Sequence, residues 1–185
     1  MKLSVIIPFM AIDEDKYRVL KETTDSFVGA DEIIVWSNWM EGYAKPINRG
    51  LRLAKGDFLM ITNDDMTYDG GSLKRLCDPD AVTSPMVNGK VQEFWGCSFV
   101  LPRWVYEKIG GMYEGYEISY YDDHDLWETL KKEKIPMRCV DSVRVETAGG
   151  RTLDRFPNRN EFFDKNRQHF IERWGYDPTG SQQYA

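Results

Sequence analysis

The 185-residue sequence has little cysteine and no long uninterrupted apolar segment. Its three cysteines, Cys77, Cys97 and Cys139, lie far apart and form no C-x-x-C pair, which argues against a disulfide framework and a zinc knuckle. No apolar run approaches the ~18 residues of a membrane-spanning helix. Basic residues are outnumbered, with 24 Lys and Arg against 30 Asp and Glu, so a generally basic nucleic-acid-binding surface is not indicated. We therefore expect a cytoplasmic protein with free thiols.

The remaining composition is that of a globular domain, with 42% hydrophobic and 14% aromatic residues. A chain of this length buries roughly 70% of the surface that its unfolded form exposes, which is enough for a core without disulfides or a structural metal. We expect one domain over residues 1–175 and a loosely held tail over 176–185.

Strand and helix patterns alternate in the first third of the chain. Strands are predicted at 3–8, 32–36 and 57–62, with helices at 14–27 and 45–55 between them. This order predicts an α/β fold with a parallel, doubly wound sheet. The second half predicts helices at 70–77, 103–109 and 125–134, strands within 91–101 and at 137–140 and 143–146, and a final amphipathic helix at 159–174. We expect Phe162, Phe163, Phe170 and Trp174 to hold that last helix on the sheet.

The residues that follow the three predicted strands are the first functional candidates, because ligands bind beyond the carboxyl ends of strands in such sheets. They are 8–10, 37–38 and 63–66. Asn63, Asp64 and Asp65 follow an apolar strand directly, and adjacent carboxylates there suit a hard divalent cation. A polar turn is the alternative interpretation, since Asn and Asp favour turns.

A second acidic cluster, Asp122, Asp123 and Asp125 with His124 among them, precedes the helix expected from Leu126. Asp123 or Asp125 could be the N-cap of that helix, although a cap explains one acid and not three. If both clusters face one cleft, five carboxylates would repel each other unless a cation is bound. This favours a metal that bridges to a diphosphate, with one carboxylate left as a general base.

Several segments occur in the order and roughly the spacing of a known family. They are Leu3–Phe9, Asp31–Val35, Asn48–Asp57, Asn63–Asp65, Gly96, Arg103, Ile109–Glu114 and Tyr121–Leu126. With these segments the chain resembles the family 2 glycosyltransferases, inverting enzymes that use nucleotide-diphosphate sugars. The resemblance implies the GT-A fold, a single Rossmann-like, doubly wound mixed sheet flanked by helices.

The resemblance also implies roles for individual residues. Asp65 stands at the position of the metal-binding aspartate of the D-x-D motif, for Mn²⁺ or Mg²⁺, and Asp123 at that of the catalytic base. Donor-binding positions are Pro8, Phe9, Ser37, Asn38, Asn48, Asn63, Asp64 and Arg151. Trp95, Gly96 and Asp122 fall where the sugar and the acceptor are approached; core burial is the alternative for Trp95.

Three features differ from the family pattern. Ser37 and Asn38 stand where an aspartate usually reads the nucleobase, so the identity of the donor nucleobase is left open. Thr147 stands where a histidine often completes the metal site; His124, Glu146 or water could take its place, and Asp64 is a further candidate ligand. The loop 149–157, with Arg151, Thr152 and Arg155, either closes over the diphosphate or is simply a solvated basic loop.

The favoured hypothesis is an enzyme that moves a sugar from a nucleotide-diphosphate sugar to a hydroxyl acceptor. The acceptor class is unassigned, nucleic acid is the least favoured because of the acidic balance, and self-association is left open. A non-catalytic sugar-nucleotide- or glycan-binding module and a nucleotidyltransferase are the alternatives. The nucleotidyltransferase lacks support because no glycine-rich, basic loop follows the first strand, and the absence of G-x-G-x-x-G there argues against a dinucleotide oxidoreductase.

Overall fold

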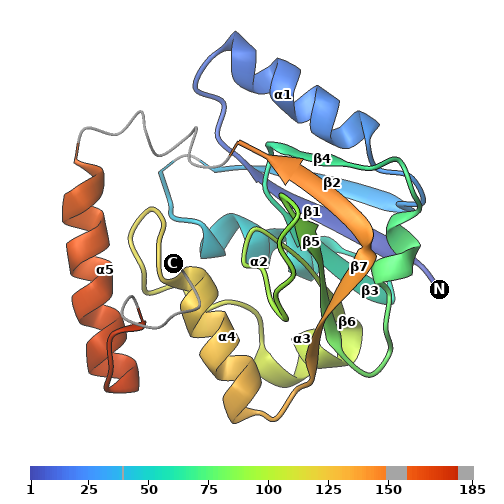
Figure 1. Ribbon diagram of the computed structural model, residues 1–185. Coiled ribbons are helices and arrows are strands. Elements are labelled where there is room, and N and C mark those ends of the chain that lie inside the picture. The colour runs from blue at the N-terminus through green and yellow to red at the C-terminus, as the bar shows by residue number, and fades with distance from the viewer. Residues whose placement is uncertain (39, 149–157, 179–185) are drawn as a thin grey trace.

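A computed structural model describes residues 1–38, 40–148 and 158–178 (Figure 1). Its centre is a seven-stranded sheet in the order β2-β1-β3-β6-β5-β7-β4. The strands are β1 (Leu3–Phe9), β2 (Glu32–Ser37), β3 (Phe58–Thr62), β4 (Met66–Tyr68), β5 (Val82–Val87), β6 (Ser98–Pro102) and β7 (Met137–Thr147). β1 pairs in parallel with β2 and β3, β6 runs antiparallel to β3 and β5, and β7 is parallel to β5 and antiparallel to β4. The predicted mixed α/β sheet is confirmed.

The unbroken apolar runs form strands that are covered on both faces. Every residue of β1 and β3 is buried, as expected for strands between two helical layers. Alternate β1 side chains enter two core clusters: Ile6 packs with α2, α3 and α4, and Val5 and Ile7 pack with η1, β4 and β7. The helices are α1 (Glu14–Asp25), α2 (Ala44–Leu53), η1 (Leu73–Leu76), α3 (Arg103–Ile109), α4 (Asp122–Lys132) and α5 (Arg159–Trp174). None of the helices in these described ranges is long and apolar enough to cross a membrane.

The second half of the sheet differs from expectation. β4 and β5 were not predicted, residues 91–97 form no strand, and β7 is one long strand instead of two short ones. β5 carries Pro85, and its pairing with β7 shifts register between Pro85 and Met86. A proline in a strand removes a donor of the ladder. That irregularity obscures the alternation from which strands are recognised.

Helix α5 does not pack on the sheet, so the predicted attachment through its aromatic residues is wrong. Phe163, Phe170 and Trp174 instead contact four tyrosines of the 113–121 segment. That face of the sheet is already occupied by α2, α3 and α4, and α5 stands outside α4 (Figure 1). The last helix therefore supports the segment that leads into α4.

Candidate active site

The carboxyl ends of β1 and β2 lie side by side, as predicted. Phe9 pairs with Ser37, and the Asn38 N–H donates to the Phe9 carbonyl at 2.7 Å. Pro8 and Phe9 are buried, Ser37 is exposed, and the buried Asn38 accepts a hydrogen bond from the Glu41 N–H. These four predicted donor-binding residues therefore form one continuous edge.

Next to the end of β3 lies a pocket of about 150 Å³, here called the Asp123 pocket. It is lined by Tyr43, Asn63, Gly96, Cys97, Ser119, Tyr120, Asp122 and Asp123. Four of these residues, Asn63, Gly96, Asp122 and Asp123, are sequence-predicted site residues from three separate segments. The fold thus brings together the end of β3, the turn before β6 and the start of α4.

Asp123 is an ionised carboxylate that is partly open to solvent. Its side chain is 35% exposed, and Oδ1 lies 2.9 Å from the His124 N–H and 3.0 Å from His124 Nδ1. Burial raises the pKa of Asp123, but the hydrogen bonds and charge of His124 outweigh it and hold the pKa below its usual range. Asp123 is therefore available as a proton acceptor at neutral pH.

Gly96 lies directly against Asp123. A Cβ atom at position 96 would fall 2.1 Å from the Asp123 Cβ and 2.8 Å from its Oδ2. Any larger residue would therefore displace the carboxylate, so the geometry requires glycine here.

Asp122 is a buried carboxyl at the same pocket. The residue is 4% exposed, and no hydrogen-bond partner for Oδ1 lies within the described part of the chain. Burial, and then the charge of Asp123, raise the pKa of Asp122 well above its usual range. A buried polar atom without a partner is rare in folded proteins. Asp122 is therefore suited to bond a hydroxyl group that enters the pocket.

Tyr43 was missed by the sequence interpretation. Its hydroxyl donates to Asn63 Oδ1 at 2.7 Å and lies 3.4 Å from the Gly96 carbonyl oxygen. Burial raises the pKa of Tyr43 well above its usual value, so the phenol keeps its proton. It joins two predicted segments, but nothing in the polar stretch around it marks its role.

Helix α4 begins at Asp122, three residues earlier than predicted. Its N-cap is Tyr121, at φ 71°, without a side-chain cap, so the prediction of Asp123 or Asp125 as N-cap is wrong. The acidic residues occupy the first turn, where the helix dipole stabilises negative charge.

Asp125 is 1% exposed and its Oδ2 accepts from Tyr116, Arg173 and Trp174 at 2.7–2.9 Å. Asp125 is therefore an anchor for α5.

The segment before α4 has a strained backbone. Ile118, Tyr120 and Tyr121 all have positive φ, at 55°, 78° and 71°, a conformation that costs on the order of 1–3 kcal/mol for such residues. Asn166 of α5, 2% exposed, holds this segment. Its Oδ1 accepts from the Glu117 N–H, and its Nδ2 donates to the carbonyls of Glu117, Ser119 and Tyr120. Helix α5 thereby fixes the approach to Asp122 and Asp123.

The three side chains of the 63–65 turn point to different places. Asn63 lines the Asp123 pocket, whereas Asp64 faces α1, where Lys16 Nζ lies 2.7 Å from its Oδ1. Burial raises the pKa of Asp64 despite this lysine. Asp65 lines a second pocket of about 220 Å³, here called the Asp65 pocket. Its other lining residues are Val19, Glu22, Thr23, Thr67, Glu146, Thr147 and Ala148.

A divalent metal beside the 63–65 turn would need oxygen ligands from the surrounding side chains. Among the described residues, no three His, Cys, Asp or Glu side chains form a group that could hold a metal. Asp64 is paired with Lys16 and His124 with Asp123, whereas the Asp65 carboxylate makes no hydrogen bond or ion pair within the same described ranges. Glu146, a predicted alternative ligand, lines the Asp65 pocket. This set fits a divalent ion held by one carboxylate, with phosphate oxygens and water as its other ligands.

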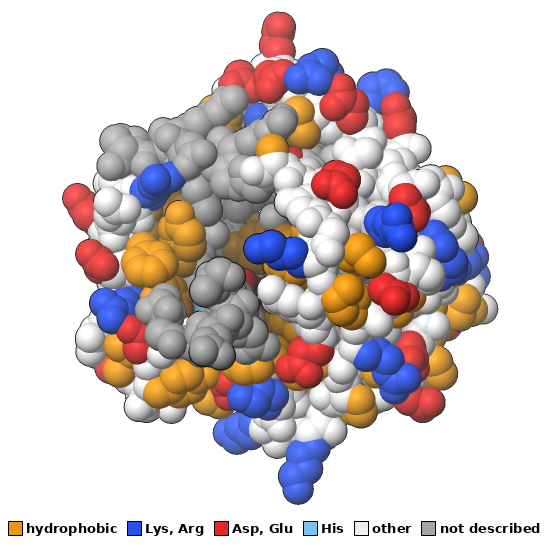
Figure 2. Space-filling view, viewed as in Figure 1, with side chains coloured by type: hydrophobic (Ala, Val, Ile, Leu, Met, Phe, Trp, Pro, Cys, Tyr) orange, Lys and Arg blue, Asp and Glu red, His pale blue; other side chains and the backbone are white. Residues whose placement is uncertain are grey.

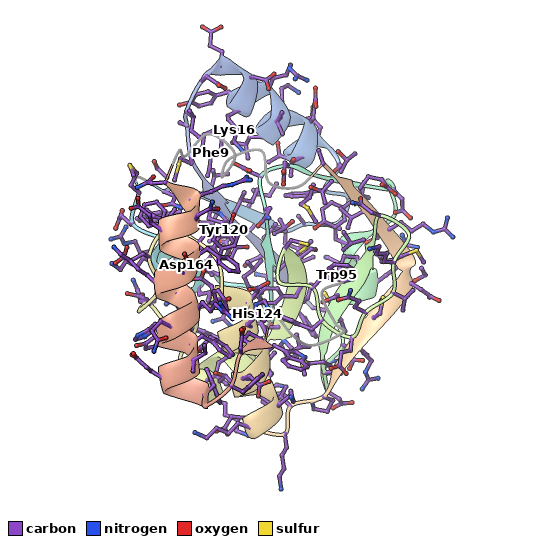
Figure 3. All side chains as sticks on the ribbon, turned by 60° about the vertical axis from the view of Figure 1, so that its left-hand side comes forward. Phe9, Lys16, Trp95, Tyr120, His124 and Asp164 are labelled. Atoms are coloured by element: carbon purple, nitrogen blue, oxygen red, sulfur yellow. The ribbon has the colours of Figure 1, made fainter. Side chains whose placement is uncertain are left out.

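Three other predicted residues lie outside both pockets or outside the described ranges. Asn48 is 5% exposed and exchanges hydrogen bonds with the backbone of Met112, which fixes the segment after Gly111 to α2. Trp95 packs against the core cluster that contains Val5 and Ile7, and Figure 3 shows it apart from His124 and Tyr120. Arg151 and the rest of the 149–157 loop lie outside the described residues.

On the face seen in Figure 2, Lys and Arg side chains are interspersed with Asp and Glu, and the surface is hollowed near its centre. Among the described side chains of this face, no extended basic field of the kind typical of nucleic-acid-binding surfaces is seen.

No protein-family model matches the sequence, and no curated protein matches it by sequence. Solved structures do match. Drosophila β-1,4-galactosyltransferase 7, in complex with manganese, UDP-Gal and xylobiose, matches with a TM-score of 0.59 and 11% identity over 87% of this chain and 79% of that chain. GalNAc-T7 with UDP, GalNAc and Mn²⁺ matches with a TM-score of 0.64 and 12% identity over 80% of this chain.

A mannosyltransferase from Pyrobaculum calidifontis, in complex with GDP-Man and Mn²⁺, matches with a TM-score of 0.60 and 16% identity over 96% of this chain and 66% of that chain. The match to GalNAc-T7, by contrast, covers only 44% of that chain. At 11–16% sequence identity, these matches show a shared backbone fold. The curled mixed sheet with its flanking helices is the GT-A glycosyltransferase fold.

Proposed function

We propose that the protein is a metal-dependent, inverting glycosyltransferase that moves a sugar from a nucleotide-diphosphate sugar to an acceptor hydroxyl. The observation that carries this proposal is the Asp123 pocket. There an ionised carboxylate, the buried carboxyl of Asp122, whose Oδ1 has no hydrogen-bond partner within the described residues, and the amide of Asn63 meet beside the turn that carries Asp65. Support also comes from the GT-A fold, since the galactosyl- and mannosyltransferases named above were solved with UDP-Gal and GDP-Man.

In this proposal Asp123 is the general base. Its Oδ1 faces His124, and its Oδ2 lies beside Gly96, so one oxygen is oriented by the protein while the other can face an acceptor hydroxyl. Asp123 takes the hydroxyl proton as the acceptor oxygen bonds to the anomeric carbon, and the bond from that carbon to the diphosphate oxygen breaks on the opposite side. The configuration at the anomeric carbon therefore inverts.

The other residues bind and orient the two substrates. The edge formed by Pro8, Phe9, Ser37 and Asn38 accepts the nucleoside, and Asn63 and Asp122 bond sugar or acceptor hydroxyls. Asp65 holds Mn²⁺ or Mg²⁺, which would neutralise charge on the departing diphosphate, and Arg151 of the 149–157 loop adds a positive charge. Asn48 acts indirectly, because its hydrogen bonds to Met112 fix the start of the segment that leads to Ser119 and Tyr120 of the Asp123 pocket.

The first test is calorimetric binding of UDP, GDP, dTDP and CDP, with and without Mn²⁺. We expect one nucleotide to bind in a Mn²⁺-dependent way to the wild type and to Asp80→Ala, a control at an exposed aspartate. Asp65→Ala should lose this binding while its thermal unfolding midpoint stays unchanged. A collapse of stability in Asp65→Ala would instead support the structural-turn interpretation.

The second test separates an enzyme from a binding module of the same fold. Asp123→Asn should lower transfer by about 10²–10⁴-fold, the range of general-base catalysis, and leave nucleotide affinity within about threefold. Turnover that survives in Asp123→Asn would remove Asp123 from the base role. Tight nucleotide binding by a wild type that transfers to no sugar, lipid or peptide acceptor would favour the binding module.

A further inference from the structure

Helix α1 presents a lysine to the interior. The buried residues of α1 are Lys16, Val19 and Thr23, although lysine is among the residues that are almost never fully buried unless paired. The Lys16 side chain is 2% exposed, and its Nζ lies 2.7 Å from Asp64 Oδ1. Phe9 and Tyr17 are in ring contact, which places the first turns of α1 beside the end of β1 (Figure 3).

The same helix also holds the backbone of Asp64. Thr23 Oγ1 donates to the Asp64 carbonyl oxygen at 3.0 Å. Asp64 is therefore fixed at two atoms by α1, whereas the adjacent Asp65 faces the Asp65 pocket. Of two neighbouring carboxylates, one is neutralised by a buried ammonium group and the other is open to a ligand.

This asymmetry decides what the 63–65 turn can offer a cation. A metal that recruited Asp64 would have to break the 2.7 Å contact between Asp64 Oδ1 and the buried Lys16 ammonium, and breaking a buried ion pair is strongly unfavourable. Mg²⁺-type ions are usually held by one or two carboxylates together with substrate phosphates and waters. With Asp64 occupied, Asp65 is the carboxylate that this turn can give to a cation, and Glu146 lines the same pocket. No three acidic, histidine or cysteine side chains of the described ranges form a metal group, so phosphate oxygens of a nucleotide and water would complete the ligand shell.

We propose that Lys16 is a positioning residue that keeps Asp64 out of metal coordination, so that the divalent metal binds at Asp65 together with the nucleotide diphosphate and not before it. This inference rests on the proposed function and deepens it. The lysine also removes one negative charge from the surroundings of the diphosphate. Lys16 thus couples metal binding to donor binding through helix α1.

The test measures Mn²⁺ binding without nucleotide, by electron paramagnetic resonance of the free ion, and again with the nucleotide selected above. The variants are Lys16→Met, the double variant Lys16→Met/Asp64→Asn, and Lys21→Met as a control at a 73% exposed lysine of the same helix. We expect the wild type and Lys21→Met to bind Mn²⁺ alone weakly and about tenfold more tightly with the nucleotide, because phosphate oxygens complete the shell.

Lys16→Met should bind Mn²⁺ alone about tenfold more tightly than the wild type, since ligand charge count sets cation affinity. The double variant, which has neither the lysine nor the carboxylate, should return to the wild-type value. Equal Mn²⁺ affinity in Lys16→Met and the wild type, with nucleotide-dependent Mn²⁺ binding intact, would overturn the inference and leave the proposed function standing. A wild type that binds no nucleotide with Mn²⁺ would overturn both.

If Lys16→Met does not fold, Asp64→Asn tests whether Asp64 coordinates the metal. The Asn amide oxygen can still accept a hydrogen bond from Lys16. We then expect nucleotide-dependent Mn²⁺ affinity within about threefold of the wild type, since Asp64 is not a ligand. A loss of about tenfold or more would show that Asp64 coordinates the metal and would overturn the inference.

Discussion

At the scale of single residues, the site depends on how closely two backbones approach. Gly96 lies so near Asp123 that a Cβ atom would overlap the aspartate side chain. The Tyr43 hydroxyl, also in this pocket, bonds Asn63 and lies near the Gly96 carbonyl. The position of the proposed base is thus set by the absence of a side chain at Gly96 and by the hydrogen bonds from His124, while Tyr43 ties Gly96 to Asn63.

Gly96→Ala should therefore act on catalysis more than on stability. The added methyl group must push Asp123 away, and a displacement of about 1 Å in a reacting group can cost about 10²-fold in rate. We expect kcat to fall by about that factor while nucleotide affinity stays within about threefold, as measured by steady-state kinetics and calorimetry. Unchanged kcat in a folded Gly96→Ala would show that Asp123 does not need its present position.

At the scale of elements, α5 works at a distance through Asn166. This side chain bonds the backbone of Glu117, Ser119 and Tyr120, in a segment where three residues have positive φ. Because that segment ends at the start of α4, a helix that touches little of the sheet controls the orientation of Asp122 and Asp123.

Replacing Asn166 by Ala should release this segment. Buried backbone groups that lose their partners cost about 1–3 kcal/mol, so the free energy of unfolding should fall by about 2 kcal/mol in urea titrations, and kcat should fall more than the donor KM rises. Lys165→Ala is the control, since it removes only an exposed ion pair with Glu117, worth about 0–1 kcal/mol. Equal effects of the two variants on kcat would contradict a positioning role for Asn166.

The edge of the sheet carries a pH-dependent contribution to stability. Glu32 of β2 accepts from Ser4 Oγ at 2.5 Å and from the Lys55 N–H at 2.9 Å, and these bonds hold the pKa of Glu32 below its usual value despite partial burial. The ionised form therefore stabilises the fold above the unfolded-state pKa of about 4.3, and this contribution is lost as the pH falls through the lowered folded-state pKa.

Glu32→Gln should accordingly be less stable than the wild type at pH 7, with a smaller difference at about pH 3, because the contribution of the ionised form decreases once the pH falls below the unfolded-state pKa. Urea unfolding at the two pH values measures both differences. A difference that is the same at both would show that the charge of Glu32 contributes nothing.

Some elements, and the meeting of some candidate residues in one pocket, could be predicted from the sequence and others could not, for identifiable physical reasons. β1 and β3 are apolar runs buried on both faces, and Asn63, Gly96, Asp122 and Asp123 follow motif order; these were recognisable. Lys16 was not, because its partner lies 48 positions away, while the neighbouring aromatic residue Tyr17 is 58% exposed. Local periodicity carries no information about such a pair.

At the scale of the whole molecule, the two pockets lie on either side of the 63–65 turn. Asn63 contributes to the Asp123 pocket and Asp65 to the Asp65 pocket. A donor that spans this turn would place its diphosphate near Asp65 and its sugar near Asp123. Such a ligand would connect α1, the end of β3, β7 and α4, elements that are distant in the sequence.

Ligand binding should therefore stabilise the fold as a whole. A nucleotide present with Mn²⁺ at 100 times its Kd adds about 2.7 kcal/mol, and for a chain of this size each kcal/mol raises Tm by about 2–4 °C. We expect a rise of about 5–11 °C in the wild type and in Asp80→Ala, and almost none in Asp65→Ala, by scanning calorimetry. Mn²⁺ alone should give a much smaller rise, because no three acidic, histidine or cysteine side chains of the described ranges form a group that could hold it without phosphate oxygens. An equal rise with Mn²⁺ alone would mean that the metal binds independently of the nucleotide, against the role assigned to Lys16.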